Sequence, residues 1–202
     1  MIRACVFDLG GVVFDFSFEP FYRQVLPHCR PGTTRHELEH LVELRHAKLE
    51  RGQESFDDYF GRYRREVGLQ MEREEFEQAW DDIFSEKPDT IALLRRIRSA
   101  RRLMLSNTDE SHIAWVKRRF PEPMALFERH FFSYELGEIK PLPGAFRAVE
   151  QWTGLAPAEH VLIDDLEGNV HAARENGWQA ITFIGAVTLE RVLASLGVEL
   201  AD

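Results

Sequence analysis

Five polar residues of this chain have types suited to chemistry on a phosphate group. They are Asp8, Ser106, Lys140 and the pair Asp164-Asp165. A carboxylate can attack phosphorus, and carboxylate oxygens are ligands that Mg²⁺ prefers in proteins. A serine hydroxyl and a lysine ammonium can bind phosphoryl oxygens. Together these residue types could form a phosphoryl-transfer site, in which positioning and charge neutralisation do most of the work.

Asp8 stands at the end of a short apolar run, residues 2–7, that predicts a buried strand. A parallel strand that ends in Asp brings the carboxylate to the edge where open α/β sheets bind ligands. Gly10 and Gly11 follow, and glycines let the backbone N–H groups of a tight turn approach an anion. Taken alone, the same pattern is also typical of a plain turn without a chemical role.

Each of the other polar positions has a structural interpretation as well. Asp164 or Asp165 could cap the helix that follows, and Ser106 could cap a helix that starts near Asp109. Lys140 could be a solvated loop lysine, as most lysines are. The interpretation as a site is favoured because all these positions converge on one edge if the strands before them are parallel.

The pattern from Pro88 onward predicts such a sheet. Short apolar strands alternate with helices of about ten residues, which is typical of a parallel sheet with right-handed crossovers. The expected strands after the first one are residues 103–105, 131–134, 161–163 and 180–184, and residues 95–102 form a basic run at the end of a helix.

Between the first strand and Pro88 the periodicity is helical. Thr34 and Glu37 form a capping-box pattern, and aromatic residues recur at helical spacing from Phe56 to Tyr63. We therefore expect a catalytic core of residues 1–15 and 87–202, with a helical cap of residues 16–86 inserted after the first strand.

A cap over the mouth of the site would select the substrate. The candidates for its inner surface are Arg45, His46, Glu50, Arg51 and Trp80. Alternatively, Trp80 belongs to the core of the helices and the charged residues form a solvated face. Gly52 allows a turn between two cap helices and a close approach to the site.

The composition argues against several classes of partner. The 202 residues carry a formal net charge of −9, which disfavours nucleic acid and anionic membranes. The sequence has no pattern of a signal peptide or a membrane span. Cys5 and Cys29 lack a CxxC neighbour, so we expect a cytoplasmic protein with reduced thiols and Cys5 in its core.

Four segments resemble, in order and spacing, the motifs of the haloacid dehalogenase (HAD) superfamily. They are residues 7–11 (FDLGG), 105–108 (LSNT), Lys140 in IKP, and 163–169 (IDDLEGN). The resemblance implies an α/β, Rossmann-like three-layer core with a parallel sheet of order 5-4-1-2-3 and an α-helical cap of the C1 type. The length, the double Asp and the stretch LERGQESFDDYF at 49–60 look most like the bacterial alpha-D-glucose-1-phosphate phosphatases.

The resemblance implies an Mg²⁺-dependent hydrolase of a small phosphate monoester, with a sugar 1-phosphate as candidate substrate. Asp8 would attack phosphorus and carry an aspartyl-phosphate. The implied metal ligands are Asp8, the Gly10 carbonyl and Asp165, with Asp164 and Asn169 behind them. The implied phosphate-binding groups are Ser106, Lys140 and the backbone N–H groups of Leu9, Gly10 and Asn107. The partner would be a small phosphorylated metabolite, and the protein would be a monomer or homodimer.

Gly10 departs from the pattern of the superfamily. Most of its phosphatases have a second Asp there, which protonates the leaving group, and such general acid–base help is worth about 10²–10⁴-fold. Either another group substitutes, or the enzyme is slow, or the leaving oxygen needs little protonation, as in a hexose 1-phosphate. The candidate substitutes are Asp15, His46 and Asp109, although each is better explained as a surface or capping residue.

Two rival functions follow from the same residues. In a haloacid dehalogenase proper, Asp8 would attack carbon without a metal, and the pair Asp164-Asp165 argues against this chemistry. A non-catalytic phosphometabolite-binding protein would keep the site without turnover, which the glycine at position 10 makes plausible.

Overall fold

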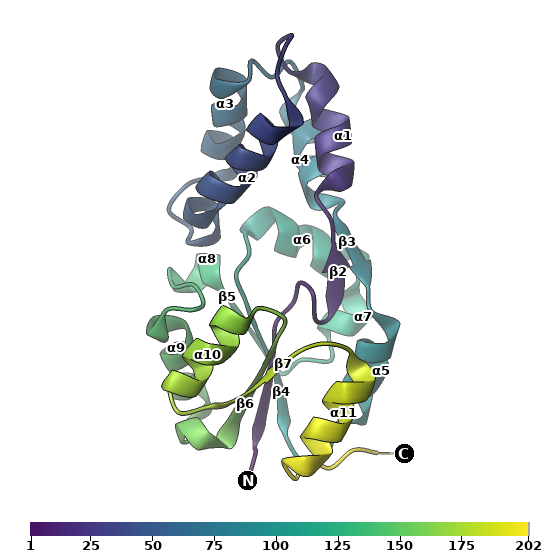
Figure 1. Ribbon diagram of the computed structural model, residues 1–202, viewed down its shortest axis with the longest axis vertical. Helices are drawn as coiled ribbons and strands as arrows, with labels where there is room; N and C mark the ends of the chain where they lie inside the picture. The colour runs from purple at the N-terminus through teal and green to yellow at the C-terminus, as the bar shows by residue number, and fades with distance from the viewer. Residues whose placement is uncertain (202) are drawn as a thin grey trace.

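A five-stranded parallel sheet forms the centre of the molecule, and a bundle of four helices lies beyond one of its edges (Figure 1). The computed structural model describes residues 1–201, except for the side chains of residues 44–46. The strands are β1 (Ala4–Phe7), β4 (Arg101–Ser106), β5 (Arg129–Phe132), β6 (His160–Asp164) and β7 (Gln179–Thr182). Their order is β5-β4-β1-β6-β7, with every pair parallel. Counted along the chain and read from the β7 edge, this order is 5-4-1-2-3.

Helices cover both faces of the sheet, because successive side chains of a strand point to opposite faces. In β1, Cys5 and Phe7 pack in one cluster with residues of α5 (Pro88–Arg96), α6 (Glu110–Arg119) and α11 (Ala186–Ser195). Ala4 and Val6 pack on the other face with α9 (Pro143–Thr153) and α10 (Glu167–Glu175). The structure is therefore the three-layer α/β fold expected from the alternating pattern.

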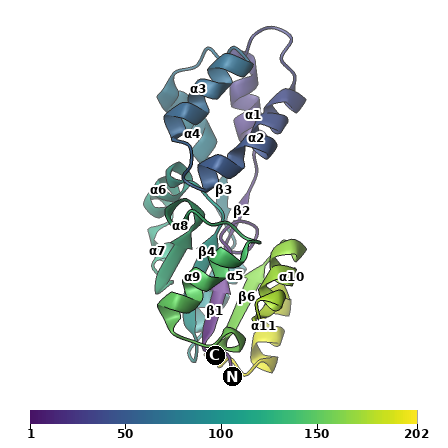
Figure 2. The same ribbon diagram turned by 90° about the vertical axis from the view of Figure 1, so that its left-hand side faces the viewer.

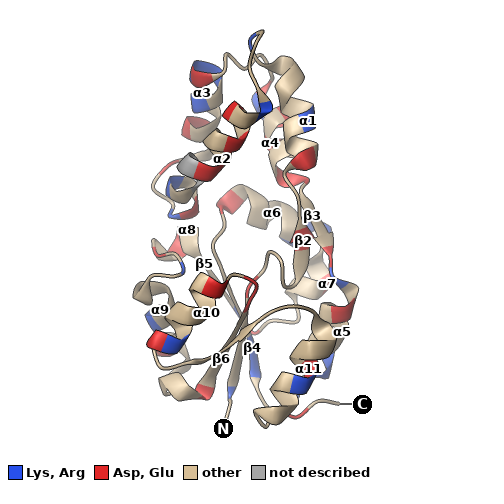
Figure 3. Cartoon of the chain, viewed as in Figure 1, with Lys and Arg blue, Asp and Glu red and all other residues tan. Residues whose placement is uncertain are grey.

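The helical bundle has a hydrophobic core of its own. It consists of α1 (Glu19–Val25), α2 (Arg35–Glu50), α3 (Phe56–Glu66) and α4 (Arg73–Asp81), with the short helix η1 (Leu26–His28) after α1. Thr34 caps α2 through the expected capping box with Glu37. Trp80 is fully buried in this core, so its structural interpretation is correct. Figure 3 shows charges of both signs along α2 and α3.

Two short antiparallel strands connect the bundle to the sheet. The chain leaves through β2 (Phe14–Phe16) and returns through β3 (Phe84–Glu86), as Figure 2 shows from the side. The two strands lie at the boundaries at which the sequence pattern changes, since β2 includes Asp15 and β3 ends at Glu86. The bundle therefore stands over the edge of the sheet at which β1 ends.

One local expectation was wrong. The strand expected at 131–134 ends at Phe132, because Ser133 begins the short helix α8 (Ser133–Leu136). The helix α5 ends within the basic run at 95–102, at Arg96, as expected, and Arg101 of the same run already lies in β4. The Arg101 guanidinium donates two hydrogen bonds to the Glu128 carboxylate. It also lies over the ring of Trp152, with 4.3 Å between Cζ and the ring centroid.

The remaining elements are short. They are α7 (Pro121–Met124) and η2 (Pro157–Glu159). Among the described residues, no helix combines the length and the apolar character needed to span a bilayer.

Candidate active site

The carboxyl ends of the central strands open onto a cavity of about 330 Å³ between the sheet and the helical bundle. The sequence-predicted site residues that line it are Asp8, Leu9, Gly10, Ser106, Asn107, Lys140, Asp165 and Asn169. Asp164 lies directly behind them and is fully buried. The structure thus brings together residues from four separate segments of the chain.

Asp8 is held by the strand before it. β1 is paired on both sides, and the Asp8 N–H donates to the carbonyl of Ile163, 2.9 Å away, which extends the pairing with β6 by one residue. The carboxylate Oδ1 accepts from the Leu9 N–H at 2.7 Å and lies 3.0 Å from Nζ of Lys140. The side chain is therefore fixed at the floor of the cavity.

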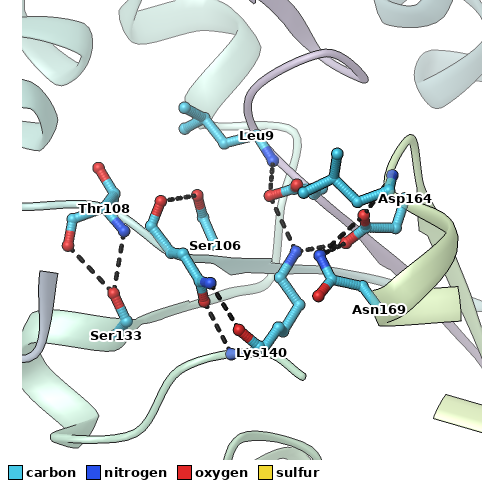
Figure 4. Close-up of polar contacts among 10 residues, drawn as sticks. Leu9, Ser106, Thr108, Ser133, Lys140, Asp164 and Asn169 are labelled. Atoms are coloured by element: carbon cyan, nitrogen blue, oxygen red, sulfur yellow. Dashed lines mark hydrogen bonds and ion pairs between the residues drawn. The ribbon is translucent and has the colours of Figure 1, made fainter. Parts of the chain in front are cut away.

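Lys140 is buried, although it comes from a loop, so the interpretation as a solvated lysine was wrong. The residue is only 2% exposed, and Nζ lies between Asp8 Oδ1 at 3.0 Å and Asp164 Oδ2 at 2.5 Å. The amide side chain of Asn107 holds its backbone: the Lys140 N–H donates to Oδ1, and Nδ2 donates to the Lys140 carbonyl, both at 2.8 Å (Figure 4). Asn107 therefore positions Lys140.

Asp164 is a fully satisfied carboxylate. Besides Lys140, it accepts two hydrogen bonds from Nδ2 of Asn169, at 3.0 and 3.1 Å, and one from the Leu166 N–H at 2.9 Å. The bond from Leu166 shows that Asp164 orders the turn before α10, but neither Asp164 nor Asp165 caps this helix, which begins after Leu166 without a side-chain cap. Asp164 thus links the lysine to this turn.

Three carboxylates could hold a metal ion. One oxygen each from Asp8, Asp164 and Asp165 lie within 4.8 Å of one another. The Asp165 carboxylate lies against Gly11, where a Cβ would stand 2.3 Å from Oδ2; Gly11 also has a φ of 72°, so only glycine fits. Because Asp164 is engaged by Lys140 and Asn169, Asp8 and Asp165 are the carboxylates that face the cavity. Such hard oxygen donors fit Mg²⁺.

The charges of this cluster are not balanced by protein groups alone. Burial raises the pKa of Asp8 to about 7, against the lowering effect of Lys140 and with a further increase from Asp164. Burial and Asp164 also raise the pKa of Asp165. For Lys140, burial acts against the charge, but the two neighbouring carboxylates raise its pKa above the ordinary value. Three carboxylates thus share one ammonium, and a divalent cation would supply the missing positive charge.

Ser106 ends β4 beside this cluster. It is 2% exposed and lines the cavity, and its hydroxyl makes one long contact, 3.4 Å, to the carbonyl of Asn107. It does not cap α6, because the cap is Asp109, whose side chain accepts from the His112 N–H at 3.0 Å. The Ser106 hydroxyl is therefore placed toward the cavity and not toward the helix.

The candidate substitutes for a missing acid lie elsewhere. Asp15 forms an exposed pair with Lys87 on the outer side of β2, and neither Asp15 nor Asp109 lines the cavity. Asp109 accepts from Trp80 Nε1 at 3.2 Å and pairs with Nδ1 of His112 at 3.0 Å. The side chains of Arg45 and His46 lie outside the described residues.

The end of α2 brings the bundle to the cavity and to the core beside it. Glu50 at the end of α2 lines it, whereas Arg51 does not. Gly52 makes the expected turn with a φ of 63°, and it packs against α8, since a Cβ would lie 2.5 Å from the Tyr134 carbonyl oxygen. Gly52 therefore allows α2 to approach the core.

Sequence reasoning missed several residues of the cavity wall. They are Phe16, Phe18, Ile83, Phe84, Thr108, His112 and Leu166. Thr108 is part of the LSNT motif, so its position carried a signal. His112 is buried against the bundle, with its ring stacked on Trp80 at 4.9 Å and Nε2 at 2.9 Å from the Trp80 carbonyl oxygen. Nothing in its local sequence distinguishes it from any residue in the first turn of a helix.

Comparisons with known proteins identify the family. A family described as haloacid dehalogenase-like hydrolase matches residues 2–177. A D-ribitol-5-phosphate phosphatase of Bacteroides thetaiotaomicron is 29% identical over 191 residues, which cover 89% of this chain and 90% of the relative.

Two solved structures are similar over nearly the whole chain. A HAD family enzyme of Bacteroides thetaiotaomicron, in complex with magnesium and inorganic phosphate, has a TM-score of 0.78 and 26% identity, covering 90% of this chain and 94% of the other. A HAD-like hydrolase of Porphyromonas gingivalis, with a TM-score of 0.79, 24% identity and coverage of 96% and 98%, shares the fold.

Proposed function

The chain belongs to the haloacid dehalogenase-like hydrolases, and from this premise we propose that it is an Mg²⁺-dependent phosphatase of small phosphate monoesters. The observation that carries the proposal is the position of Asp8, a buried carboxylate at the floor of the cavity, 3.0 Å from the Lys140 ammonium. A relative that is named a phosphatase and a similar enzyme that holds magnesium and phosphate support it.

The substrate we propose is a small sugar or alditol phosphate. The sequence pattern favoured a glucose 1-phosphate, whereas the relative is a phosphatase of D-ribitol 5-phosphate. The glycine at position 10 favours a leaving oxygen that needs little protonation, as in a sugar 1-phosphate, while the relative's substrate is the ester of a primary alcohol. A substrate panel must therefore include both kinds of ester.

We assign the catalytic core to residues 1–15 and 87–202 and the cap, of the C1 type, to residues 16–86. The bundle supports this division because it has a separate hydrophobic core and joins the sheet through β2 and β3. As a cap, it would close the cavity with residues such as Glu50 and Phe18. Closure would shield the reacting groups from bulk solvent.

In the proposed reaction, a carboxylate oxygen of Asp8 attacks phosphorus, and the bond from phosphorus to the ester oxygen breaks. The leaving oxygen takes a proton from water, because Gly10 offers none. Water then attacks the aspartyl-phosphate and releases phosphate, which regenerates the carboxylate. Lys140 and Ser106 would hold the phosphoryl oxygens, together with the N–H groups of Leu9, Gly10 and Asn107.

The metal would be held by Asp8, the Gly10 carbonyl and Asp165, while Asp164 and Asn169 support the cluster from behind. Mg²⁺ supplies positive charge that lets a phosphate dianion approach the Asp8 carboxylate. Asp164 has a second role, since its pair with Lys140 keeps the ammonium directed at Asp8.

The deciding experiment is phosphate release from a panel of phosphate monoesters, with Mg²⁺ and with EDTA, for the wild type and Asp8→Asn. We expect release that needs Mg²⁺ and disappears in the variant. Full activity in Asp8→Asn would contradict the assignment of the nucleophile. No release from any ester would favour the two rival functions, and chloride release from a 2-haloacid would then separate a dehalogenase from a binding protein.

A further inference from the structure

Phe16 is a large apolar side chain that the fold leaves exposed at the mouth of the cavity. The residue lines the cavity and is 48% exposed, whereas most large apolar residues of the described chain are buried. Leu166, which is 59% exposed, lines the same cavity. A ligand that enters the cavity would therefore cover apolar surface that is otherwise in contact with water, and covering such surface is favourable.

Phe16 is one of three phenylalanines that line the cavity beside one another. Phe16 in β2 and Phe84 in β3 are directly opposite in the antiparallel pairing, so their side chains share one face. The centroid of the Phe16 ring lies 6.4 Å from that of Phe84 and 6.2 Å from that of Phe18. All three residues line the cavity. We call Phe16, Phe18 and Phe84 the aromatic wall.

The two inner rings of the aromatic wall are held by buried neighbours. Phe18 packs on Trp80 of the bundle, with 5.2 Å between the ring centroids. Phe84 packs edge to face with His112 of α6, with 5.1 Å between the centroids. Phe16 is the most exposed member of the wall. The wall is therefore formed before a ligand binds, and a preformed surface loses little conformational freedom on binding.

The aromatic wall lies beside the path of the organic part of an ester. Asp8 is at the floor of the cavity, at the end of β1, whereas β2 and β3 run from the sheet to the bundle (Figure 1). An ester whose phosphorus lies at Asp8 must direct its organic part away from the floor, toward the mouth. The organic part would then lie against the rings of the wall.

We propose that the aromatic wall, with Phe16 as its outer member, binds the C–H face of a sugar ring and so selects phosphates of cyclic sugars over phosphates of open-chain alditols. This inference rests on the proposed phosphatase function and names the substrate class within it. The C–H groups on one face of a sugar ring are weakly positive, and they pack on the negative face of an aromatic ring. An open chain must give up internal rotations to present the same surface, which weakens its binding. A cavity of about 330 Å³ is small for a ligand site and suits a single ring.

The first test uses two esters that differ in the ring. D-ribose 5-phosphate and D-ribitol 5-phosphate both have five carbons and a primary ester oxygen, but ribose closes to a five-membered ring and ribitol stays open. For each ester, kcat/KM is measured with the wild type, with Phe16→Leu, which keeps an apolar side chain without the flat ring, and with Phe16→Tyr, which keeps the ring. We expect the wild type to prefer D-ribose 5-phosphate. We expect Phe16→Leu to lower the ratio of the two values about 2- to 10-fold, the worth of one aromatic contact, and Phe16→Tyr to keep it.

Two results of this test would overturn the inference. They are a preference of the wild type for the open chain and an unchanged ratio in Phe16→Leu. Trp152→Leu is the matched control, because Trp152 is an aromatic residue that is 40% exposed and does not line the cavity. We expect its ratio to equal that of the wild type, and a drop as large as that in Phe16→Leu would also overturn the inference. Since a ratio does not depend on the amount of folded protein, a loss of stability in a variant cannot imitate the expected result.

A second test does not depend on turnover. Calorimetry with Mg²⁺ present measures the binding of D-ribose 5-phosphate and of inorganic phosphate to Asp8→Asn, with and without Phe16→Leu. We expect the second substitution to weaken binding of the sugar phosphate about 2- to 10-fold and to leave binding of inorganic phosphate unchanged. Absence of sugar phosphate binding, or equal weakening of both ligands, overturns the inference. If the wild type releases no phosphate from any ester, the proposed phosphatase function fails, and this binding experiment still decides the role of the aromatic wall.

Discussion

The ring of Phe16 covers Gly10. A Cβ at position 10 would lie 3.0 Å from both Cδ1 and Cε1 of this ring, a distance that real Cβ atoms rarely tolerate. Phe16 is the last residue of β2, and it is 48% exposed at the mouth of the cavity. A side chain at position 10 would therefore crowd this ring, which would have to shift by a few tenths of an ångström to make room.

This pair predicts how an acid could be introduced. Gly10→Asp alone should gain less activity on alkyl phosphates than the same substitution without Phe16, because the new side chain crowds the ring. The double variant Gly10→Asp/Phe16→Ala should have more space for the carboxylate, and we expect its kcat on n-pentyl phosphate to exceed that of Phe16→Ala by about 10²-fold, the lower end of the usual contribution of a general acid. Phosphate release by the three variants measures this. Equal rates for the double variant and Phe16→Ala would show that a carboxylate at position 10 cannot act as an acid here.

The buried ion pairs of Lys140 predict a large effect on stability. Lys140→Met leaves the Asp8 and Asp164 carboxylates without their cation, and breaking a buried pair in this way costs about 3–5 kcal/mol of the free energy of unfolding. Lys87→Met is the matched control, because Lys87 pairs with the exposed Asp15, and such surface pairs contribute about 0–1 kcal/mol. Urea unfolding of both variants gives the comparison. Similar losses in the two variants would contradict the importance of the buried cluster.

The sequence predicts the floor of the site much better than its walls. Asp8 and the pair Asp164-Asp165 could be placed because each follows a strand, and parallel strands end at one edge whatever covers them. The burial of Lys140 could not be predicted, since it depends on Asn107, which lies 33 positions away along the chain. The same holds for Phe16, whose contact with Gly10 requires β2 to turn back over the edge of the sheet.

The contact between the bundle and α6 should weaken as the pH rises. Burial acts against the charged form of His112, but Asp109 outweighs this effect and raises its pKa in the folded protein, with a smaller contribution from Asp81. A group with a raised folded pKa contributes stability below its unfolded pKa of about 6.5, and this contribution is lost as the pH rises through the folded value. Burial also raises the pKa of Asp81 to about 6, despite the hydrogen bond from Ser111. The folded protein therefore also loses stability as the Asp81 carboxyl ionises with rising pH.

The measurement is the difference in the free energy of unfolding between the wild type and His112→Gln from pH 5 to pH 9. We expect the difference to be largest near pH 5 and to shrink toward pH 9. His36→Gln serves as the control, because His36 is exposed on the first turn of α2. A difference that is constant with pH would mean that His112 does not hold its charge in the contact with Asp109.

Removing one carboxylate from the metal cluster should separate metal binding from folding. Without metal, Asp8, Asp164 and Asp165 repel one another around a single ammonium. Among the three, Asp165 is the one that is not buried, and its pKa is nevertheless raised. Asp165→Asn relieves this repulsion, so in EDTA we expect the variant to unfold at the same temperature as the wild type or slightly above it. With Mg²⁺ at 100 times the dissociation constant, the wild type should gain about 2.7 kcal/mol, whereas the variant should gain much less. Thermal unfolding across a series of Mg²⁺ concentrations gives both values. If Mg²⁺ stabilises both proteins equally, Asp165 is not a ligand, and the cation would have to be held by Asp8 and backbone oxygens alone.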